Sequence, residues 1–138
     1  MSEEVRNVEL LRKSYGVWSK TRGATCDHWL EICAEKIAFG SLAHGPPAVS
    51  YMTAYQSRDE LRGYFAGLAR DWEMMEFEID HFVAQGDRVV MLGRCAWRFR
   101  KTGKVVWTPK ADAWRFENGK AVEFFEYYDT AQVMAAVA

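Results

Sequence analysis

The 138-residue chain has neither a long hydrophobic run nor an excess of one charge. No segment reaches the about 20 apolar residues of a membrane-spanning helix, and the N-terminus lacks the basic-then-apolar pattern of a signal peptide. The formal net charge is −1, with Lys and Arg spread along the chain, so no basic surface for nucleic acid is indicated. We therefore expect a cytoplasmic protein that binds neither membrane nor nucleic acid.

Cysteine and metal-binding motifs are also scarce. The three cysteines, Cys26, Cys33 and Cys95, show no close pairing pattern. An odd count of this kind is typical of free thiols in a reducing compartment. Neither HExxH nor CxxC occurs, so we expect no metal ion.

Aromatic residues, in contrast, are abundant. The chain has six Trp, six Tyr and eight Phe, and 49% of its residues are hydrophobic. This is ample core material for one domain spanning residues 1–138. The surplus can line a pocket, cover a dimer face or simply fill an aromatic core.

The first half of the chain is expected to be mainly helical. Apolar residues recur every three or four positions through Trp18 and form one face of an amphipathic helix that ends at Thr21–Gly23. A second helix is predicted from Thr25 or Asp27 through Ile37, followed by a short strand at 36–40. After a second strand, Val49–Tyr55, the pair Ser57 and Glu60 forms a capping box that opens a third helix.

From Met74 onward the hydrophobic pattern changes to period two, which indicates strands. Three further strands are predicted at Val89–Arg100, Val105–Glu117 and Ala121–Asp129, separated by glycine turns. Helices followed by a meander of strands indicate an α+β fold. We expect a cone-shaped barrel, in which a curved, mostly antiparallel sheet wraps around the N-terminal helices and encloses a cavity.

Four local motifs connect this order of elements to a known family. They are Gly86-Asp87-Arg88-Val89, Thr102-Gly103-Lys104, the run Asp112–Lys120, and Glu126-Tyr127-Tyr128-Asp129. With these motifs, nearly the whole chain resembles the nuclear transport factor 2-like superfamily, and within it the SnoaL-like polyketide cyclases and ketosteroid isomerases. The resemblance implies the fold more strongly than a reaction, because this fold hosts enzymes and non-enzymes.

The resemblance also implies roles for individual residues. Asp112 matches the oxyanion-hole Asp of the isomerases, and Tyr15 matches their oxyanion-hole Tyr. The isomerase base would fall near Ser41, which is no carboxylate. In relatives similar to limonene epoxide hydrolase, Glu126 would be one acid of an Asp–Arg–Asp set whose other members fall near Gly93 and Cys95, so that set is broken. In SnoaL-like cyclases a single strand Asp is the acid/base, and Asp112 fits that role.

The turn at Asn118-Gly119 leaves two registers open. A two-residue turn closes Glu117 against Lys120 and places Asp112 opposite Phe125. A type I turn with Gly119 as a bulge closes Phe116 against Lys120, which places Asp112 opposite Phe124 and Glu126 on the same face. A shift of the pairing by one residue moves every side chain to the other face of the sheet. The family resemblance favours the second register.

In the favoured register the inward residues form an aromatic cup that contains two acids and a lysine. The cup suits a small, flat, mostly apolar ligand. Its predicted lining is Trp18, Trp29, Tyr64, Cys95, Trp97, Phe99, Lys110, Trp114, Phe124 and Tyr128.

Two acids in one apolar cup cannot both ionise cheaply, so one is expected to have a raised pKa. A neutral Asp112 beside Tyr15 would donate a hydrogen bond to a substrate carbonyl, and an ionised Glu126 would act as general base. This predicts a cofactor-free isomerase, cyclase or lyase of small hydrophobic carbonyl compounds. The alternative is a non-catalytic ligand-binding or dimer-forming domain, in which Glu126 is simply paired with Lys110 and Tyr15 is a core residue.

The outer face of the sheet is expected to be apolar. Trp107, Ala111, Ala113, Phe125 and Tyr127 point away from the cup in the favoured register. Aromatic side chains gathered on one exposed face tend to be covered by a partner. Since family members commonly pair through this face, we expect a homodimer.

Overall fold

The computed structural model describes residues 1–43 and 54–138. Helices and strands alternate in the first half, and four long strands follow. In chain order the elements are α1 (Glu3–Lys20), α2 (Asp27–Ile32), β1 (Cys33–Ser41), β2 (Tyr55–Ser57), α3 (Leu61–Asp71), β3 (Trp72–Gln85), β4 (Arg88–Phe99), β5 (Val105–Glu117), β6 (Lys120–Tyr128) and α4 (Thr130–Val137).

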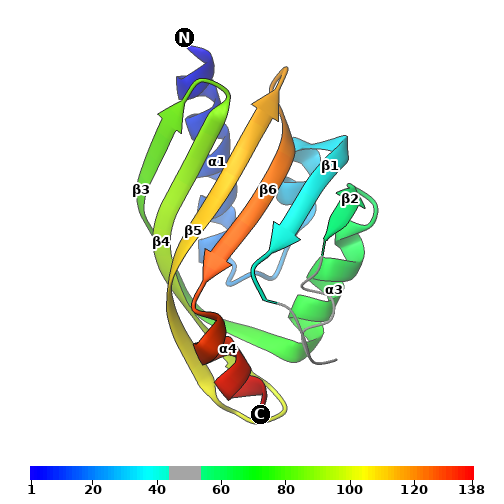
Figure 1. Cartoon of the computed structure of the whole chain (residues 1–138), viewed down its shortest axis with the longest axis vertical. Helices are drawn as coiled ribbons and strands as arrows, with labels where there is room; N and C mark the ends of the chain where they lie inside the picture. Colours follow the sequence, from blue (N-terminus) through cyan, green and yellow to red (C-terminus); the bar gives the residue numbers. More distant parts are fainter. Residues whose placement is uncertain (44–53) are drawn as a thin grey trace.

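The six strands form one curved sheet in the order β2-β1-β6-β5-β4-β3. Every neighbouring pair is antiparallel except β1 and β6, which run parallel. Helix α1 lies behind the sheet and α3 lies below β2, at the open side of the curve (Figure 1). The predicted α+β class, with a curved and mostly antiparallel sheet against N-terminal helices, is confirmed.

Helix α1 covers the inner face of the sheet with the residues that its periodicity predicts. Ser2 Oγ caps the helix by accepting a hydrogen bond from the Val5 N–H at 3.2 Å. Leu11, Tyr15 and Trp18 are buried against the sheet. The apolar stripe therefore determines which side of the helix faces the cup.

The second helix is shorter than predicted. It ends at Ile32, because Cys33 already has extended backbone angles (φ −81°, ψ 141°) and begins β1. Within β1, the alternate residues Ile37, Phe39 and Ser41 are buried. In so short a segment the apolar residues fit both the spacing of four of a helix and the spacing of two of a strand. The parallel pairing with β6 makes the segment a strand.

The elements around the third helix and at the C-terminus complete the fold. Most of the predicted strand Val49–Tyr55 lies outside the described residues, and the described strand β2 is Tyr55–Ser57. The apolar C-terminal tail forms helix α4, whose first turn is capped by Asp129 Oδ1 accepting from the Gln132 N–H at 3.1 Å. The expected capping contact before α3 does form, with Ser57 Oγ accepting from the Glu60 N–H at 3.3 Å.

The β5–β6 hairpin follows neither of the two predicted registers. Its turn is the two-residue type, since Glu117 pairs with Lys120 and both Asn118 (φ 51°) and Gly119 (φ 78°) have positive φ. A bulge opposite Arg115/Phe116 then shifts the register, so that Asp112 lies opposite Glu126. The predicted pairings of Asp112 were therefore wrong, whereas the prediction that Asp112 and Glu126 share the inner face is confirmed.

The bulge also changes which residue near the turn is buried. Ala121 pairs with Phe116 and is fully buried, whereas the next residue, Val122, is only partly buried. Beyond the bulge, Phe124 and Glu126 are the buried residues of β6. Because β6 has one extra residue at the bulge, the hairpin can have a two-residue turn and still point Glu126 into the cup.

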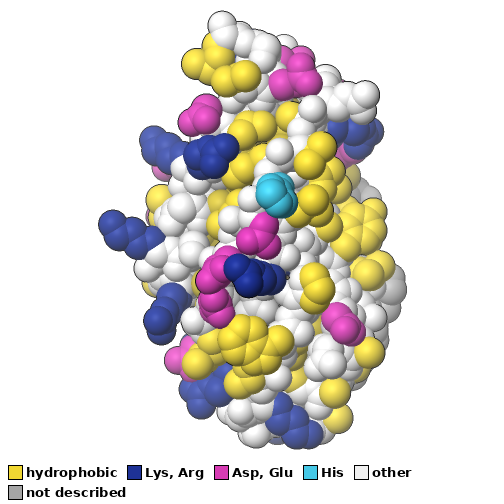
Figure 2. Space-filling view, turned by 90° about the vertical axis from the view of Figure 1, so that its left-hand side faces the viewer, with side chains coloured by type: hydrophobic (Ala, Val, Ile, Leu, Met, Phe, Trp, Pro, Cys, Tyr) yellow, Lys and Arg dark blue, Asp and Glu magenta, His cyan; other side chains and the backbone are white. Residues whose placement is uncertain are grey.

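The outer sheet face carries apolar side chains between charged ones. Trp107 is 64% exposed, Tyr127 46% and Leu92 39%. An open groove of about 690 Å³ crosses this face and is lined in part by Leu92, Ala111 and Tyr127. Figure 2, seen from the β3 side, shows hydrophobic patches among acidic and basic side chains.

Within residues 1–43 and 54–138, the helices are too short or too polar to cross a membrane.

The turn geometry gives a first test. Replacing Gly119 by Ala puts a Cβ on a residue with φ 78° that has no neighbouring atom within 4 Å, so the cost is conformational and we expect a loss of about 1 kcal/mol. Gly63→Ala, also in open space but within α3, should instead stabilise by about 0.5–1 kcal/mol. Urea denaturation measures both, and an unchanged Gly119→Ala variant would contradict the assigned turn.

Candidate functional site

The candidate site is a cavity between the inner sheet face and helices α1–α3. Its volume is about 100 Å³, and its wall is almost entirely apolar. This is less than the about 150 Å³ cavity that holds a benzene ring, so a ring-sized ligand requires that wall side chains shift. The lining residues discussed below include Tyr15, Trp18, Trp29, Tyr64, Trp72, Phe77, Cys95, Trp97, Lys110, Asp112, Trp114, Phe124, Glu126 and Tyr128.

Lys110 lies between the two buried acids. Its Nζ is 2.9 Å from Asp112 Oδ1 and 3.8 Å from Glu126 Oε1. Lys110 and Asp112 lie on β5 and Glu126 lies on the adjacent strand β6. The three side chains are 12%, 2% and 7% exposed, respectively. The same Nζ also contacts the Phe77 ring at 5.7 Å from its centroid. The cup therefore holds a nearly dry ionic cluster.

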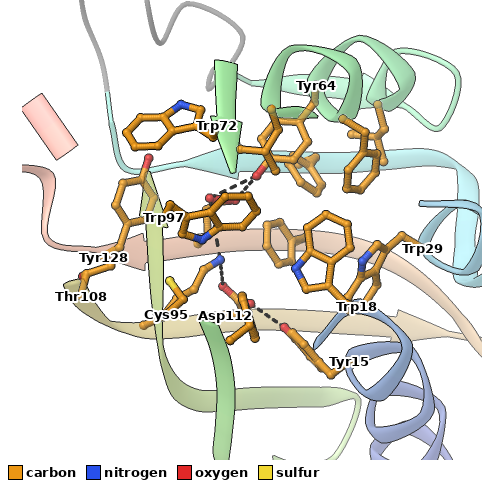
Figure 3. A pocket seen from close by; sticks show the side chains of 18 of the residues that line it. Tyr15, Trp18, Trp29, Tyr64, Trp72, Cys95, Trp97, Thr108, Asp112 and Tyr128 are labelled. Carbon is orange, nitrogen blue, oxygen red and sulfur yellow. Dashed lines mark hydrogen bonds and ion pairs between the residues drawn. The ribbon is translucent and has the colours of Figure 1, made fainter. Parts of the chain in front are cut away.

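Each acid also accepts a hydrogen bond from a tyrosine on a helix. Tyr15 O–H donates to Asp112 Oδ2 at 2.5 Å. Tyr64 O–H donates to Glu126, with Oε2 at 2.9 Å and Oε1 at 3.3 Å. The dashed lines in Figure 3 join Tyr64, the acids with the lysine between them, and Tyr15 into one chain across the cavity.

The indole of Trp114 extends the hydrogen-bonded chain at Tyr15. Trp114 Nε1 can only donate, and it donates to the Tyr15 oxygen at 2.9 Å. The Tyr15 O–H in turn donates to Asp112 Oδ2. Asp112 Oδ1 has no well-aligned hydrogen bond in the described chain, and the Lys110 ammonium is its partner.

Burial and neighbouring charges control the protonation of this cluster. Burial raises the pKa of Glu126, and the charge of Asp112 adds to this, while Lys110 and the hydrogen bond from Tyr64 lower it without cancelling the rise. Burial, aided by the charge of Asp112, also raises the pKa of Tyr15 well above its ordinary value. The sequence predicted that one acid of the cup has a raised pKa, and Glu126 is such an acid.

Lys110 and Cys95 are not activated as nucleophiles. Burial lowers the pKa of Lys110, but the charges of Asp112 and Glu126 outweigh it and leave the pKa above its ordinary value. Burial raises the pKa of the Cys95 thiol to about 11. The amine is thus an ammonium and the thiol is protonated near neutral pH.

The predicted site residues come together with one exception. Tyr15, Asp112 and Glu126 and nearly all of the predicted pocket set line the cavity. Phe99 does not line it; this residue is buried against Trp72, with ring centroids 4.9 Å apart. Sequence reasoning missed Trp72 and Phe77, which are inward residues of β3 whose alternation is interrupted by bulges.

The residues where relatives would carry further catalytic groups have other roles here. Ser41 is buried and its Oγ lies 2.6 Å from the Tyr128 hydroxyl. Gly93 lies where a Cβ would be 2.2 Å from the Glu78 carbonyl oxygen, so no larger residue fits in this backbone. The part of the chain that the structure describes contains no group of three His, Cys, Asp or Glu side chains arranged to hold a metal ion.

Comparison with known families agrees with this fold. A family model described as SnoaL-like domain matches residues 12–124, and the chain belongs to this family. No curated protein matches the chain.

Three solved structures illustrate the relationship. A nuclear transport factor 2-like protein of unknown function from Burkholderia pseudomallei is 24% identical, with a TM-score of 0.81 over 100% of this chain and 99% of the other. A proposed SnoaL-like polyketide cyclase from Mesorhizobium loti is 17% identical, with a TM-score of 0.74 over 93% and 100%. TerC, co-crystallised with polyporic acid, is 18% identical, with a TM-score of 0.77 over 96% and 98%. At these identities the likeness establishes the fold alone.

The raised pKa of Glu126 gives a second test. An acid whose pKa is higher in the folded state binds more protons there, so its contribution lowers stability as pH rises from about 4.5 through the folded value. Glu126→Gln removes this ionisation and can still accept from Tyr64. We therefore expect the stability of the variant relative to the native protein to increase with pH.

Urea denaturation between pH 4 and 8 measures this difference. Glu31→Gln, at an exposed position of α2, is the control and should give a difference that varies little with pH. A Glu126→Gln difference that stays flat, or decreases with pH, would show that Glu126 is fully ionised at little cost.

Proposed function

We propose that this protein is a cofactor-independent acid/base enzyme that acts on a small, hydrophobic carbonyl compound. The observation that supports this most is the buried ammonium of Lys110 between two carboxyl groups in an otherwise apolar cavity. A cation in a dry site stabilises negative charge that develops on a carbonyl oxygen. The solved structure described as a SnoaL-like polyketide cyclase is consistent with enolate chemistry.

Each charged residue receives a role from its contacts. Glu126, whose pKa burial raises, is the proton-transfer group, because a base is most effective when its pKa lies near the working pH. Lys110 stabilises the enolate oxygen, and Asp112 holds Lys110 in place and keeps it charged. In the step, Glu126 takes a proton from the carbon next to the carbonyl, the electron pair moves onto the oxygen beside Lys110, and the proton later returns to carbon.

A second assignment follows the family resemblance, with Asp112 as the acid/base and Tyr15 as a donor to the carbonyl. In this assignment the Tyr15 O–H has to donate to the ligand carbonyl instead of to Asp112 when the ligand binds. In the free site Tyr15 and Asp112 are hydrogen-bonded at 2.5 Å. The non-catalytic alternative is favoured by the fact that both acids already accept hydrogen bonds from Tyr15 and Tyr64.

Exchange of carbonyl-adjacent protons tests the proposal without knowledge of the natural substrate. Cyclopentanone and 2-cyclohexenone are incubated with the protein in D₂O, and loss of the proton signals is followed by NMR. We expect exchange whose rate rises with pH as Glu126 ionises. Glu126→Gln should slow it by at least about 100-fold, because that is the usual contribution of a general base.

The variants distinguish the two assignments. If Asp112 only positions Lys110, Asp112→Asn should retain more activity than Glu126→Gln; equal or greater loss in Asp112→Asn would instead make Asp112 the base. Lys101→Gln, on an exposed turn away from the cavity, is the matched charge-removal control. No exchange with any ketone of a broader carbonyl panel would favour the non-catalytic alternative.

We also propose that two copies pair through the outer sheet face. The support is the exposure of Trp107 and Tyr127 together with the groove across β3–β6. Trp107→Glu should then shift the mass measured by light scattering from dimer to monomer, while Lys101→Gln should not. A native protein that is monomeric at high concentration would exclude the pairing.

A further inference from the structure

Ser41 is a buried polar residue of the cup that has no role in the proposed reaction. It is 3% exposed, and it follows Ile37 and Phe39 in the alternation of buried residues along β1. In the parallel pairing of β1 with β6, Ser41 lies beside Glu126, and the next amide, Leu42 N–H, donates to the Glu126 carbonyl oxygen at 3.1 Å. The sheet therefore places the Ser41 hydroxyl next to the carboxyl group of the proposed base.

A chain of hydrogen bonds leads through Ser41 to this carboxyl group. The Ala43 N–H donates to the Tyr128 hydroxyl oxygen at 3.2 Å, and that hydroxyl lies 2.6 Å from Ser41 Oγ. Ser41 is also hydrogen-bonded to the Glu126 side chain and thereby lowers the pKa of Glu126. An ionised carboxylate can only accept, so Ser41 donates its single proton to Glu126. The Ser41 oxygen then accepts from the Tyr128 O–H.

Hydroxyl donors from two different elements therefore hold the Glu126 carboxylate. Tyr64 on α3 donates to Oε2 at 2.9 Å, and Ser41 on β1 is the second donor. Lys110 Nζ, at 3.8 Å, is too far for a hydrogen bond and acts through its charge. The other titratable groups that affect Glu126 or are affected by it are Asp112 of β5, Tyr128 of β6, Tyr15 of α1 and Cys95 of β4. Two hydrogen bonds from separate elements restrict rotation of the carboxylate.

We propose that Ser41, held by Tyr128, is a positioning residue that orients the Glu126 carboxylate and stabilises its ionised form. This rests on the proposed function in so far as Glu126 is the base. A hydroxyl donates a stronger hydrogen bond to a charged carboxylate than to a neutral carboxyl group, so the contact favours the form that can take a proton. Position 41 thus supplies a donor to the base on the neighbouring strand.

Titration of Glu126 itself tests the proposal without any substrate. With ¹³C-labelled glutamate, NMR follows the side-chain carboxyl signal of Glu126 from about pH 4 to about pH 9. Ser41→Ala should raise the pH at which this signal titrates, and Ser41→Thr, which keeps the hydroxyl, should restore the native behaviour. Ser14→Ala removes another buried serine hydroxyl, from α1, and is the matched control that should leave the titration unchanged. An unchanged titration in Ser41→Ala would overturn the proposal.

Tyr128→Phe is a second variant, which leaves Ser41 in place. Hydrogen bonds in a chain strengthen one another, so loss of the Tyr128 hydroxyl should weaken the bond from Ser41 to Glu126. The Glu126 signal should then titrate at higher pH than in the native protein, by less than in Ser41→Ala. If Ser41→Ala does not fold, this variant decides. A native-like titration in Tyr128→Phe would exclude the role of Tyr128 and, where Ser41→Ala does not fold, overturn the proposal.

The ketone exchange assay shows whether this positioning serves the reaction. Ser41→Ala should slow exchange about fivefold or more at neutral pH, because less of Glu126 is ionised, and should slow it less at about pH 9. An equal loss at both pH values would reduce Ser41 to a structural role. Failure of the native protein to exchange any ketone, together with a shifted Glu126 titration in Ser41→Ala, would refute the catalytic proposal and leave the contact between Ser41 and Glu126 standing.

Discussion

The ion pair between Lys110 and Asp112 is the interaction on which the rest of the site depends. Removing two charges from water costs several kcal/mol each, and their attraction offsets this only when the remaining polar atoms are also satisfied. Here Tyr15, itself bonded by Trp114, donates to Asp112, and Tyr64 donates to Glu126. Helices α1 and α3 therefore have to lie where their hydroxyl groups reach the sheet, so the charged cluster and the helix packing constrain each other.

The aromatic wall makes these charges effective. Trp29 stacks on Trp114 with ring centroids 5.5 Å apart, and Tyr15 packs edge-on to Trp29 at 4.8 Å. Because few polar groups or solvent screen the cluster, each charge strongly affects its neighbours. The same exclusion of solvent that raises the pKa of Glu126 would strengthen the effect of Lys110 on a developing oxyanion.

The fold sets the positions that line the cavity without specifying a reaction. The chain has the SnoaL-like domain, yet Ser41 stands where the isomerase base is expected, and Gly93 lies where the hydrolase-like set would need a polar residue. Lys110, flanked by two acids, is the cation of this cavity. A shared fold thus fixes which positions face the cavity, while the residues at those positions decide which oxygen or proton can be handled there.

The sequence alone determined the fold class, the inward face that Asp112 shares with Glu126, and most of the cavity lining, because these follow from the periodicity of helices and strands and from motifs that resemble a known family. The end of α2 at Ile32 depended on the pairing of β1 with β6, which local patterns do not encode. The bulge beyond the turn set Asp112 opposite Glu126, a register that neither simple turn predicts. Only the tertiary structure placed Lys110 nearer Asp112 than Glu126, because such distances depend on how neighbouring strands meet.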